Sequence, residues 1–478
     1  MISKKMLING EWVDAVSGET LTTVNPATED VFGEVPSSDK EDVDRAVAAA
    51  RAAFPEWSAK PQEYRSNVLN QIAAKIRAQA GEIAHLAAQE HGMPEKLGFG
   101  PTMGAAGNFE MAAVYARATG GELIKSVKTN VMYCFDRVPI GVCALIIPWN
   151  LPFFLMAQKI ALCISMGNTC VVKPPSINSV IGLKLAEIVD SVEGLPKGVV
   201  NVITGPGGRT GNLLASHPGV DAVGFTGSTE TGVSIMKAAA PTIKKVVMEL
   251  GGKNPAIIFP DAPMHLALES LGHHQFFNCG QACGSPGRYY VHKSIFDEFV
   301  TRLTEVAKKQ VIGDPTAPET TMGPMVSAEH AGKVMSYIES GINEGANLVI
   351  GGKRHGDKGF FIEPTIFTDV KEDMMIYRDE IFGPVAVITT WDDEDEVLRR
   401  ANDNTYGLTA SIWTTNIAHA LKLGRRLTVG TFSVNGHNLI APEAPWGGVR
   451  ESGIGKEGGW QGVLEYTEQK MITINLDE

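Results

Sequence analysis

The chain has 478 residues, of which 44% are hydrophobic and 20% charged, and its formal net charge is −12. At roughly 150 residues per domain, this length predicts about three structural units. The acidic balance disfavours a nucleic-acid partner and an anionic membrane surface, and we expect neither.

The N-terminal lysines are not followed by an apolar stretch of signal-peptide length, so we expect a cytoplasmic protein whose thiols stay reduced. The six cysteines show no C-x-x-C spacing, and we expect no bound metal. The most apolar segment, 141–166, is interrupted by Pro148, Pro152 and Lys159, which predicts a buried strand, a loop and a buried helix rather than a membrane span.

The first clear element is a helix that begins near residue 38. Ser38 and Glu41 fit a capping box, and apolar residues recur at helical spacing from Val43 to Phe54. Two later segments, 121–138 and 464–476, read instead as amphipathic strands. Because strands at a domain edge often pair with each other or with another subunit, we expect these segments to do so.

Strands and helices alternate from 168 to 250. The strands in this region are almost continuously apolar, which predicts a parallel sheet covered by helices on both faces. A second alternating series follows residue 252 and predicts a second α/β domain. Its expected helices are 294–309, 331–346 and 393–403.

Two glycine-rich turns, Gly205–Gly211 and Phe225–Gly232, follow apolar strands and open helices. Backbone amides at such a helix N-terminus bind phosphate, but neither turn matches G-x-G-x-x-G, and a plain tight turn is the alternative. Lys173 ends a strand where its side chain would reach a ribose or a phosphate. A surface lysine is the alternative there.

Two polar residues stand in otherwise apolar surroundings. Asn150, in IIPWNLPFF, is either a structural bridge to loop backbone groups or a fixed donor toward a developing oxyanion. Glu249 ends the strand KKVVMEL, where burial would raise the pKa of the carboxyl group, as a general base requires. A loop-capping carboxylate is the alternative for Glu249.

The segment FFNCGQACGSPGR contains two cysteines. Cys283 lies between Ala282 and Gly284 in a predicted loop, which leaves its sulfur open to a ligand. Cys279 follows aromatic residues and is expected to be packed and inert. A Cys–His dyad with the histidine pair 273–274 is disfavoured, because that pair falls within a helical pattern.

In their order and spacing these motifs resemble the aldehyde dehydrogenase superfamily, of the hydrolytic NAD(P)-dependent type, over nearly the whole chain. The separation of Glu249 and Cys283 matches the family's spacing between base and nucleophile. The matching segments are PWNLP, KPP, FTGST, MELGGKNP, GQAC, EIFGPV and PWGGVRESGIGKEG.

The resemblance implies a role for each matching residue. Cys283 would attack the aldehyde carbonyl, the Asn150 side chain and the Cys283 backbone N–H would stabilise the oxyanion, and Glu249 would activate the water that hydrolyses the thioester. The cofactor would be held by Pro148, Trp149, Lys173, Ser176, Gly207, Gly211, Phe225, Gly227, Ser228, Leu250, Glu380 and Phe382.

Ser176 departs from the pattern of the NAD-preferring members. Those members carry a glutamate at this position, where the carboxylate would accept hydrogen bonds from the adenosine ribose and repel a 2′-phosphate. Because Ser176 carries no charge, we expect NAD and NADP both to serve as cofactors.

The implied substrate pocket is mostly apolar. Members that take semialdehydes often carry an arginine where this chain has Gln158, so we expect a neutral aldehyde, either small and hydroxylated (lactaldehyde-like) or aromatic (benzaldehyde-like). The alternatives are a semialdehyde dehydrogenase, a CoA-acylating dehydrogenase and a non-catalytic relative. The expected pocket residues are Leu151, Phe154, Leu155, Gln158, Ala282, Gly284, Ile440 and Trp446, with His437 and Asn438 as further hydrogen-bonding groups.

The implied fold is α/β, with a Rossmann-like cofactor domain, an α/β catalytic domain and a small bridging β element for oligomerisation. The expected dinucleotide-binding domain is 1–120 and 140–251, the catalytic domain is 252–445, and the bridging strands are 121–139 and 464–478. The bridging strands would join the subunits of a homodimer or homotetramer.

Overall fold

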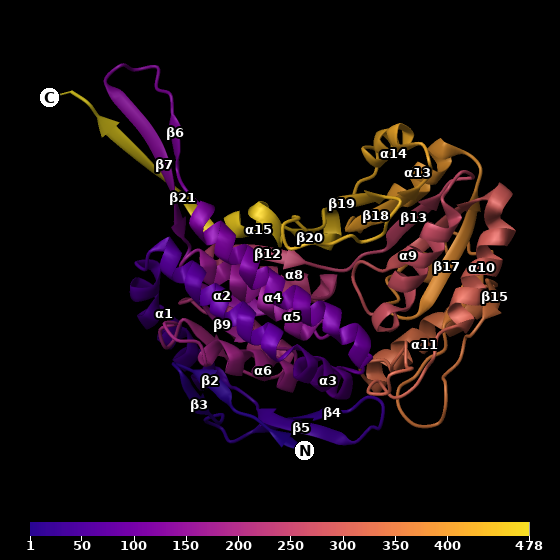
Figure 1. Cartoon of the computed structure of the whole chain (residues 1–478), viewed down its shortest axis with the longest axis horizontal. Helices are drawn as coiled ribbons and strands as arrows, with labels where there is room; N and C mark the ends of the chain where they lie inside the picture. The colour runs from indigo at the N-terminus through magenta and orange to yellow at the C-terminus, as the bar shows by residue number, and fades with distance from the viewer. Residues whose placement is uncertain (478) are drawn as a thin grey trace.

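The computed structural model describes residues 1–477, and their strands form four sheets. An eight-stranded sheet lies in the left-hand body of Figure 1, and a seven-stranded sheet lies in the second lobe. One of the two three-stranded sheets lies at the bottom of the body, and the other forms an arm that projects from it. This α/β architecture is the one that the sequence predicts.

The eight-stranded sheet has five parallel strands at its centre. Numbered along the chain, these strands lie side by side in the order 3-2-1-4-5, which is the Rossmann order. The parallel strands are β8 (Val142–Ile146), β9 (Thr169–Lys173), β10 (Val200–Val202), β11 (Ala222–Thr226) and β12 (Lys245–Glu249). The antiparallel edge strands are β2 (Met6–Ile8), β3 (Glu11–Val13) and β20 (Gly453–Ile454).

Helices cover both faces of this sheet. Successive side chains of a strand point to opposite faces, and in these apolar strands both faces therefore need to be buried. In β8, Val142 and Ala144 pack in one core with apolar residues of α1, α7 and α8, whereas Cys143 and Leu145 pack in another core with those of α5 and α6. The helices that cover the sheet are α1 (Lys40–Ser58), α5 (Pro152–Ser165), α6 (Ser179–Asp190), α7 (Asn212–Ser216) and α8 (Thr229–Ala239).

The N-terminal cap of α1 is one residue later than the sequence predicts. Asp39 accepts hydrogen bonds from the backbone N–H groups of Glu41 and Asp42, and the Asp42 carboxylate accepts one from the Asp39 N–H. The Ser38 hydroxyl instead pairs with the Thr210 hydroxyl at 3.2 Å. The predicted capping box at Ser38 and Glu41 is therefore wrong, because a buried contact with another segment withdraws Ser38 from the helix.

Further helices pack outside α5 and α6 and form a layer that the sequence pattern did not resolve. The strands of the small sheet at the bottom of the body lie beside α6 (Figure 1). These helices are α2 (Gln62–Ala78), α3 (Ala80–His91), α4 (Glu95–Ala118) and α15 (Gly459–Leu464), and the small sheet consists of β1 (Ile2–Ser3), β4 (Thr20–Val24) and β5 (Val31–Pro36).

The second lobe contains the seven-stranded sheet, which is parallel apart from its edge strand β15. The three helices predicted after residue 252 are present as α10, α11 and α13. The strands are β13 (Asn254–Ile258), β14 (Pro286–His292), β15 (Asn347–Ile350), β16 (Thr365–Thr368), β17 (Val385–Trp391), β18 (Thr409–Trp413) and β19 (Thr431–Val434). The helices are α9 (Met264–Phe276), α10 (Phe296–Lys308), α11 (Ala328–Asn343), α12 (Met375–Arg378), α13 (Glu394–Asn402) and α14 (Ile417–Gly424).

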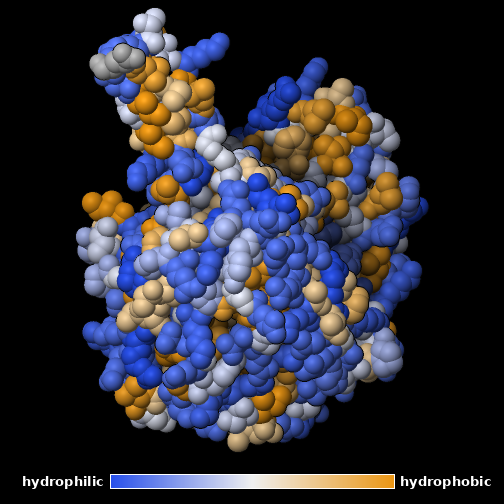
Figure 2. All heavy atoms as spheres, turned by 60° about the vertical axis from the view of Figure 1, so that its left-hand side comes forward, coloured by the Kyte–Doolittle hydropathy of each residue, from blue (hydrophilic) through white to orange (hydrophobic). Residues whose placement is uncertain are grey.

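The arm consists of β6 (Glu122–Ile124), β7 (Val131–Pro139) and β21 (Thr467–Asn475). β21 pairs antiparallel with β7 along its whole length, so the two predicted segments do pair with each other. The segment 121–138 is not one strand, however, but a hairpin of β6 and β7. The predicted bridging range 464–478 ends in residue 478, which lies outside the described residues. Apolar side chains gather on the arm in Figure 2, and Leu123 and Met471 are 70% and 61% exposed. Within residues 1–477, no helix has the length and apolar character that crossing a membrane requires.

Candidate active site

The residues predicted to bind the cofactor gather where the parallel strands of the eight-stranded sheet end. β8 leads into Pro148–Trp149–Asn150, β9 ends at Lys173, β11 leads into Gly227–Ser228, and β12 ends at Glu249. In a sheet with this strand order, ligands bind beside the carboxyl ends of the strands, at the point where the order reverses. Here that point lies between β8 and β11.

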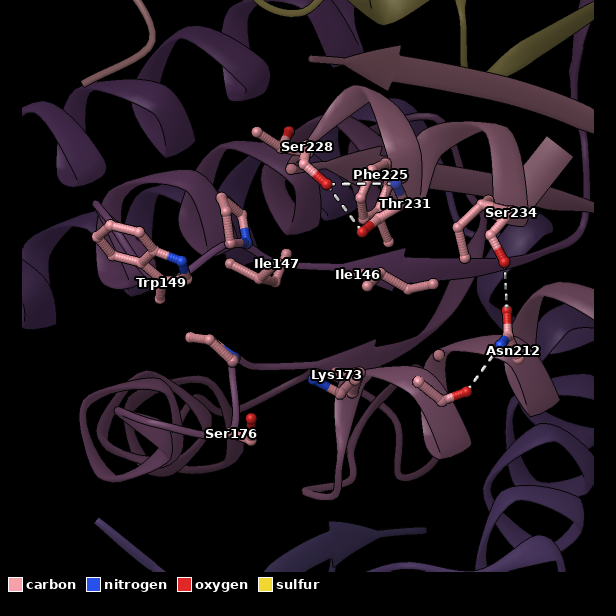
Figure 3. A pocket seen from close by; sticks show the side chains of 18 of the residues that line it. Ile146, Ile147, Trp149, Lys173, Ser176, Asn212, Phe225, Ser228, Thr231 and Ser234 are labelled. Carbon is pink, nitrogen blue, oxygen red and sulfur yellow. Dashed lines mark hydrogen bonds between the residues drawn. The ribbon is translucent and has the colours of Figure 1, made fainter. Parts of the chain in front are cut away.

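A cavity of 520 Å³, which we call the cofactor cleft, opens at these strand ends (Figure 3). Figure 3 shows Ile146 and Ile147 on the strand end between two walls, with Ser228 and Thr231 on one side and Lys173 and Ser176 on the other. The predicted cofactor residues that line the cleft are Pro148, Trp149, Lys173, Ser176, Gly207, Gly211, Phe225, Gly227 and Ser228.

One wall of the cleft is the N-terminus of α8. Ser228 is its N-cap residue and accepts a hydrogen bond from the Thr231 backbone N–H at 3.2 Å. A Cβ atom at Gly227 would lie 2.4 Å from the Phe225 ring, so a larger residue here would displace that ring from the wall of the cleft. The free amides and the dipole of such a terminus suit a phosphate group.

The opposite wall carries Lys173 and Ser176. Lys173 is only 3% exposed, and burial lowers the pKa of its ammonium to about 8. Its Nζ donates to the Pro174 carbonyl at 3.0 Å and keeps further N–H donors for a ligand. The acidic residue that lines the cleft, Glu230, lies on the α8 wall. A helix terminus, an ammonium group and apolar strand ends together fit a dinucleotide.

A second cavity of 500 Å³, the catalytic cavity, adjoins the cleft and shares Pro148, Trp149, Gly227 and Ser228 with it. Asn150 and Cys283 line it, together with the remaining predicted cofactor residues Leu250, Glu380 and Phe382. The structure thus brings two of the three predicted catalytic residues to one cavity. Within residues 1–477, no three His, Cys, Asp or Glu side chains are grouped as metal ligands would be.

Cys283 belongs to a strained segment, residues 277–285, which we call the nucleophile turn. Asn278, Cys279 and Gly280 have φ angles of 51°, 58° and 70°, so three successive residues adopt the left-handed conformation. Such strain persists only where the surroundings impose it. A Cβ at Gly280 would lie 2.2 Å from the Gly383 carbonyl oxygen, so this glycine packs against the segment that carries Phe382 and does not leave open space for an aldehyde.

Side-chain amides hold the nucleophile turn in place. Asn254 Nδ2 donates to the carbonyls of Cys283 at 2.7 Å and Ser285 at 2.8 Å. Asn278 Nδ2 donates to the Asn150 carbonyl at 2.9 Å, and the Asn150 side chain donates to the Gln281 carbonyl at 3.2 Å. The Asn150 amide therefore lies against the turn that carries the thiol.

The two cysteines of the turn have different surroundings. Burial, reinforced by the negative charges of Glu249 and Glu380, raises the pKa of the Cys283 thiol to about 12, yet the residue keeps some exposure and lines the catalytic cavity. Cys279 is 2% exposed, and its Sγ donates to the Gly323 carbonyl at 3.0 Å. The prediction that Cys279 is a packed thiol is confirmed, and both cysteines are free.

Glu249 is 3% exposed, and neither of its carboxylate oxygens has a hydrogen-bond partner among the described residues. Burial raises the pKa of this carboxyl to about 8, although Lys159 and Lys456 oppose the shift. Glu249 acts electrostatically on the Cys283 thiol, and its Oε1 would lie 2.5 Å from a Cβ at Gly447. Such a carboxyl titrates in the range that a general base needs.

Four of the residues expected around the substrate lie at the N-cap or in the N-terminal half of α5: Leu151, Phe154, Leu155 and Gln158. Leu151 and Phe154 line a small cavity of 30 Å³ with Asn150, and Phe154 packs against Gly104 of α4. Gln158 is 5% exposed, whereas Ile440 is 43% exposed. Leu155, Ala282 and Trp446 are half-buried.

Two expectations for this region need correction. Gly284 is buried against the Asn438 side chain, whose atoms would lie 2.4 to 2.6 Å from a Cβ at Gly284, so the glycine provides packing space and not room for substrate. His437 is fully buried and bonded to protein atoms on both ring nitrogens, so it offers no hydrogen bond to a ligand.

Sequence reasoning missed the residues that α11 contributes to the catalytic cavity, among them His330 and Lys333. The His330 ring packs against Trp149 at 4.9 Å between centroids, and its Nε2 donates to the Phe382 carbonyl at 2.8 Å. Phe382 has a left-handed φ of 56°, which this bond helps to hold. His330 and Lys333 share a face of α11, because they are three residues apart in the helix. In the sequence, this spacing alone does not distinguish residues that line a cavity from residues that face solvent.

A sequence model described as the aldehyde dehydrogenase family matches residues 12–472. The mitochondrial aldehyde dehydrogenase of Leishmania tarentolae is 41% identical over 473 residues, which is 98% of this chain and 95% of that protein. The betaine aldehyde dehydrogenase of Bacillus subtilis is 39% identical over 480 residues, covering 99% of this chain and 98% of that protein.

Solved structures of similar proteins also match this chain over nearly its whole length. An NAD-dependent aldehyde dehydrogenase from Sinorhizobium meliloti superposes with a TM-score of 0.97 at 38% identity, covering 100% of this chain and 95% of that chain. An NADP-dependent enzyme of E. coli gives a TM-score of 0.97 at 35% identity, covering 99% of this chain and 98% of that chain. Because the family model matches the chain almost from end to end and these relatives match it over nearly its whole length, the chain belongs to the aldehyde dehydrogenase family.

Proposed function

We propose that this chain oxidises an aldehyde to the carboxylic acid with NAD⁺ or NADP⁺, through a covalent thioester on Cys283. One observation carries the proposal. Cys283 and Asn150 line a cavity that adjoins the cofactor cleft, and the carboxyl of Glu249, buried without a hydrogen-bond partner, acts on the same thiol.

Each catalytic residue has a separate task. The Cys283 thiol gives its proton to solvent as its Sγ attacks the carbonyl carbon, and the Asn150 amide and the Cys283 N–H donate to the oxygen that becomes negative. A bound nicotinamide supplies the hydride acceptor that the oxidation requires. Glu249 then takes a proton from a water molecule, which attacks the thioester and releases the acid and the free thiol. A CoA-acylating enzyme would need no such base, so Glu249 argues against that alternative.

The charge around Ser176 supports use of both cofactors. Lys173 is the basic residue on this wall of the cleft, and the acidic residue Glu230 belongs to the opposite wall. A 2′-phosphate next to Ser176 would therefore meet an ammonium group and no adjacent carboxylate. The relatives include proteins described as NAD-dependent and as NADP-dependent.

The substrate that we propose is a neutral aldehyde, either small and hydroxylated or aromatic. The residues still expected around it carry no charged group: they are Leu151, Phe154, Leu155, Gln158, Ala282, Ile440 and Trp446. An uncharged wall gives no ion-pair partner to the carboxylate of a semialdehyde, which makes that alternative the weaker one.

The sheets support the proposed division of the chain, except that β20 (Gly453–Ile454) adds to the eight-stranded sheet from outside the proposed ranges. The dinucleotide-binding domain is 1–120 and 140–251, the catalytic domain is 252–445, and the arm joins subunits of a homodimer or homotetramer. The exposed apolar residues of the arm, such as Leu123 and Met471, support this role because a second subunit would cover them.

The proposed function is tested by measuring the aldehyde-dependent formation of NADH or NADPH in the variant Cys283→Ala. The variant Cys279→Ala serves as the matched control. We expect loss of activity in the first variant only, since only Cys283 lines the catalytic cavity. Persistent activity in Cys283→Ala would refute the assignment of the nucleophile. A panel of hydroxylated, aromatic and carboxylated aldehydes, assayed with both cofactors, tests the substrate and the cofactor.

A further inference from the structure

A buried series of three hydrogen-bonded side chains contacts the backbone of the nucleophile turn. Trp413 Nε1 donates to the Ser411 hydroxyl at 3.1 Å, the same hydroxyl pairs with His437 Nδ1 at 2.9 Å, and His437 Nε2 lies 2.8 Å from the Gly284 carbonyl oxygen. All three side chains are fully buried. The series therefore ends on the residue that follows Cys283.

The chemistry of the partners fixes the direction of every bond in this series. A backbone carbonyl only accepts, so His437 Nε2 must carry the proton and donate it to Gly284. Burial and the neighbouring His274 lower the pKa of His437 to about 3, so the ring is neutral and Nδ1 is an acceptor. The Ser411 O–H consequently donates to Nδ1, while its oxygen accepts from Trp413, which is a donor only.

The position of His437 excludes it from the chemistry itself. His437 lines neither the cofactor cleft nor the catalytic cavity. Its own backbone N–H donates to the Ser270 hydroxyl at 3.2 Å, which anchors the residue to α9. The ring thus reaches the nucleophile only through the Gly284 carbonyl.

We propose that His437 is a positioning residue that fixes the backbone after Cys283, so that the thiol faces the Asn150 amide. Asn254 holds the carbonyls of Cys283 and Ser285, and His437 holds the carbonyl between them. Gly284 has no side chain to restrict its backbone, so the bond from His437 replaces that restriction. This inference rests on the proposed role of Cys283 as the nucleophile.

The experiment compares His437→Gln with His437→Asn, each with and without Ser411→Ala. The glutamine amide can place its N–H where Nε2 lies, whereas the shorter asparagine amide cannot reach Gly284. Two quantities are measured: the single-turnover rate of NAD(P)H formation, and the rate at which iodoacetamide alkylates Cys283 without cofactor. Alkylation needs the thiol but not its alignment with a carbonyl and an oxyanion donor.

We expect His437→Asn to lower the single-turnover rate by about tenfold or more, because small misplacements of reacting groups are costly. His437→Gln should restore most of that rate. In His437→Asn, the rate of Cys283 alkylation should not fall although the single-turnover rate does. The buried Cys143, Cys163 and Cys170 should stay unmodified in each variant, which would show that the fold is intact.

Ser411 provides the sharper test, because it acts on the turn only through the ring of His437. Ser411→Ala should lower the rate in the wild-type background and have less than a twofold effect in the His437→Gln background. Equal losses in the two backgrounds, or an unchanged rate in His437→Asn, would overturn the inference. Activity that survives Cys283→Ala would instead refute the proposed function on which the inference rests.

Discussion

Replacing Glu249 with glutamine isolates the step that this residue is proposed to catalyse. The substitution keeps the shape of the side chain but removes its ability to accept a proton. Because Glu249 is buried without a hydrogen-bond partner among the described residues, its carboxyl has a pKa of about 8, and it works as a base only when deprotonated. Hydrolysis of the thioester should therefore accelerate as the pH rises through this value.

The expected size of the effect follows from the pKa. With a pKa of about 8, about one tenth of the carboxyl groups are deprotonated at pH 7 and about nine tenths at pH 9, so hydrolysis should speed up about tenfold between these values. Glu249→Gln should lose this rise and hydrolyse the thioester about 100-fold to 10,000-fold more slowly, the usual range for removal of a general base.

The assay needs no cofactor. An activated ester such as p-nitrophenyl acetate acylates the Cys283 thiol, and the loss of the acetyl mass from the Cys283 peptide is followed from pH 6 to about pH 9.5. The glutamine variant supplies the rate due to hydroxide alone at each pH. A pH dependence that is the same in both proteins would refute the reasoning.

The same pKa also has a consequence for stability. The folded-state pKa of Glu249 is raised from 4.5 to about 8, so the stability linked to its proton is fully present below about pH 4.5 and is lost as the pH rises toward 8. Glu249→Gln should escape this loss, so its Tm relative to the wild type should increase between pH 5 and pH 8. A difference in Tm that does not change with pH would contradict the burial of a neutral carboxyl.

Three further substitutions test other parts of the account. Asn150→Ala should lower the single-turnover rate by about 100-fold to 1,000-fold through loss of an oxyanion donor, and a change of less than about threefold would exclude that role. Ser176→Glu should reduce kcat/KM with NADP by at least about tenfold relative to NAD, equivalent to about 1.4 kcal/mol, and an unchanged ratio would place the 2′-phosphate elsewhere. Met471→Lys on the arm should shift the protein toward smaller species in sedimentation, whereas Val311→Lys, at a residue of the second lobe that is 43% exposed, should not. Equal behaviour of the two variants would contradict a subunit contact through the arm.

Much of the fold was predictable because its signals are local. The apolar strands between 168 and 250 could only be buried on both faces, which required a parallel sheet between helices. Parallel strands end at the same edge, so Lys173 and Glu249, at the ends of two strands, had to lie on the same edge of the sheet. The two amphipathic strands of the arm were recognisable because neither belonged to an alternating series.

The parts that were not predictable depend on contacts between distant segments. Strand β20 adds to the eight-stranded sheet from residues 453–454, after the whole second domain, and two residues carry no periodic signal. The capping position of α1 moved from Ser38 to Asp39 because Ser38 contacts Thr210. His437 read as a group that could face the substrate, yet the fold turns it toward Ser411 and the Gly284 carbonyl.

The most direct test of the central claim is to trap the covalent intermediate. Glu249→Gln is mixed with an aldehyde that the wild type oxidises and with NAD⁺ or NADP⁺, the reaction is quenched in acid, and the peptides are weighed. We expect one acyl group on the peptide that contains Cys283, formed together with one equivalent of reduced cofactor. Reduced cofactor that forms without an adduct on Cys283, or with the adduct on another cysteine, would contradict it.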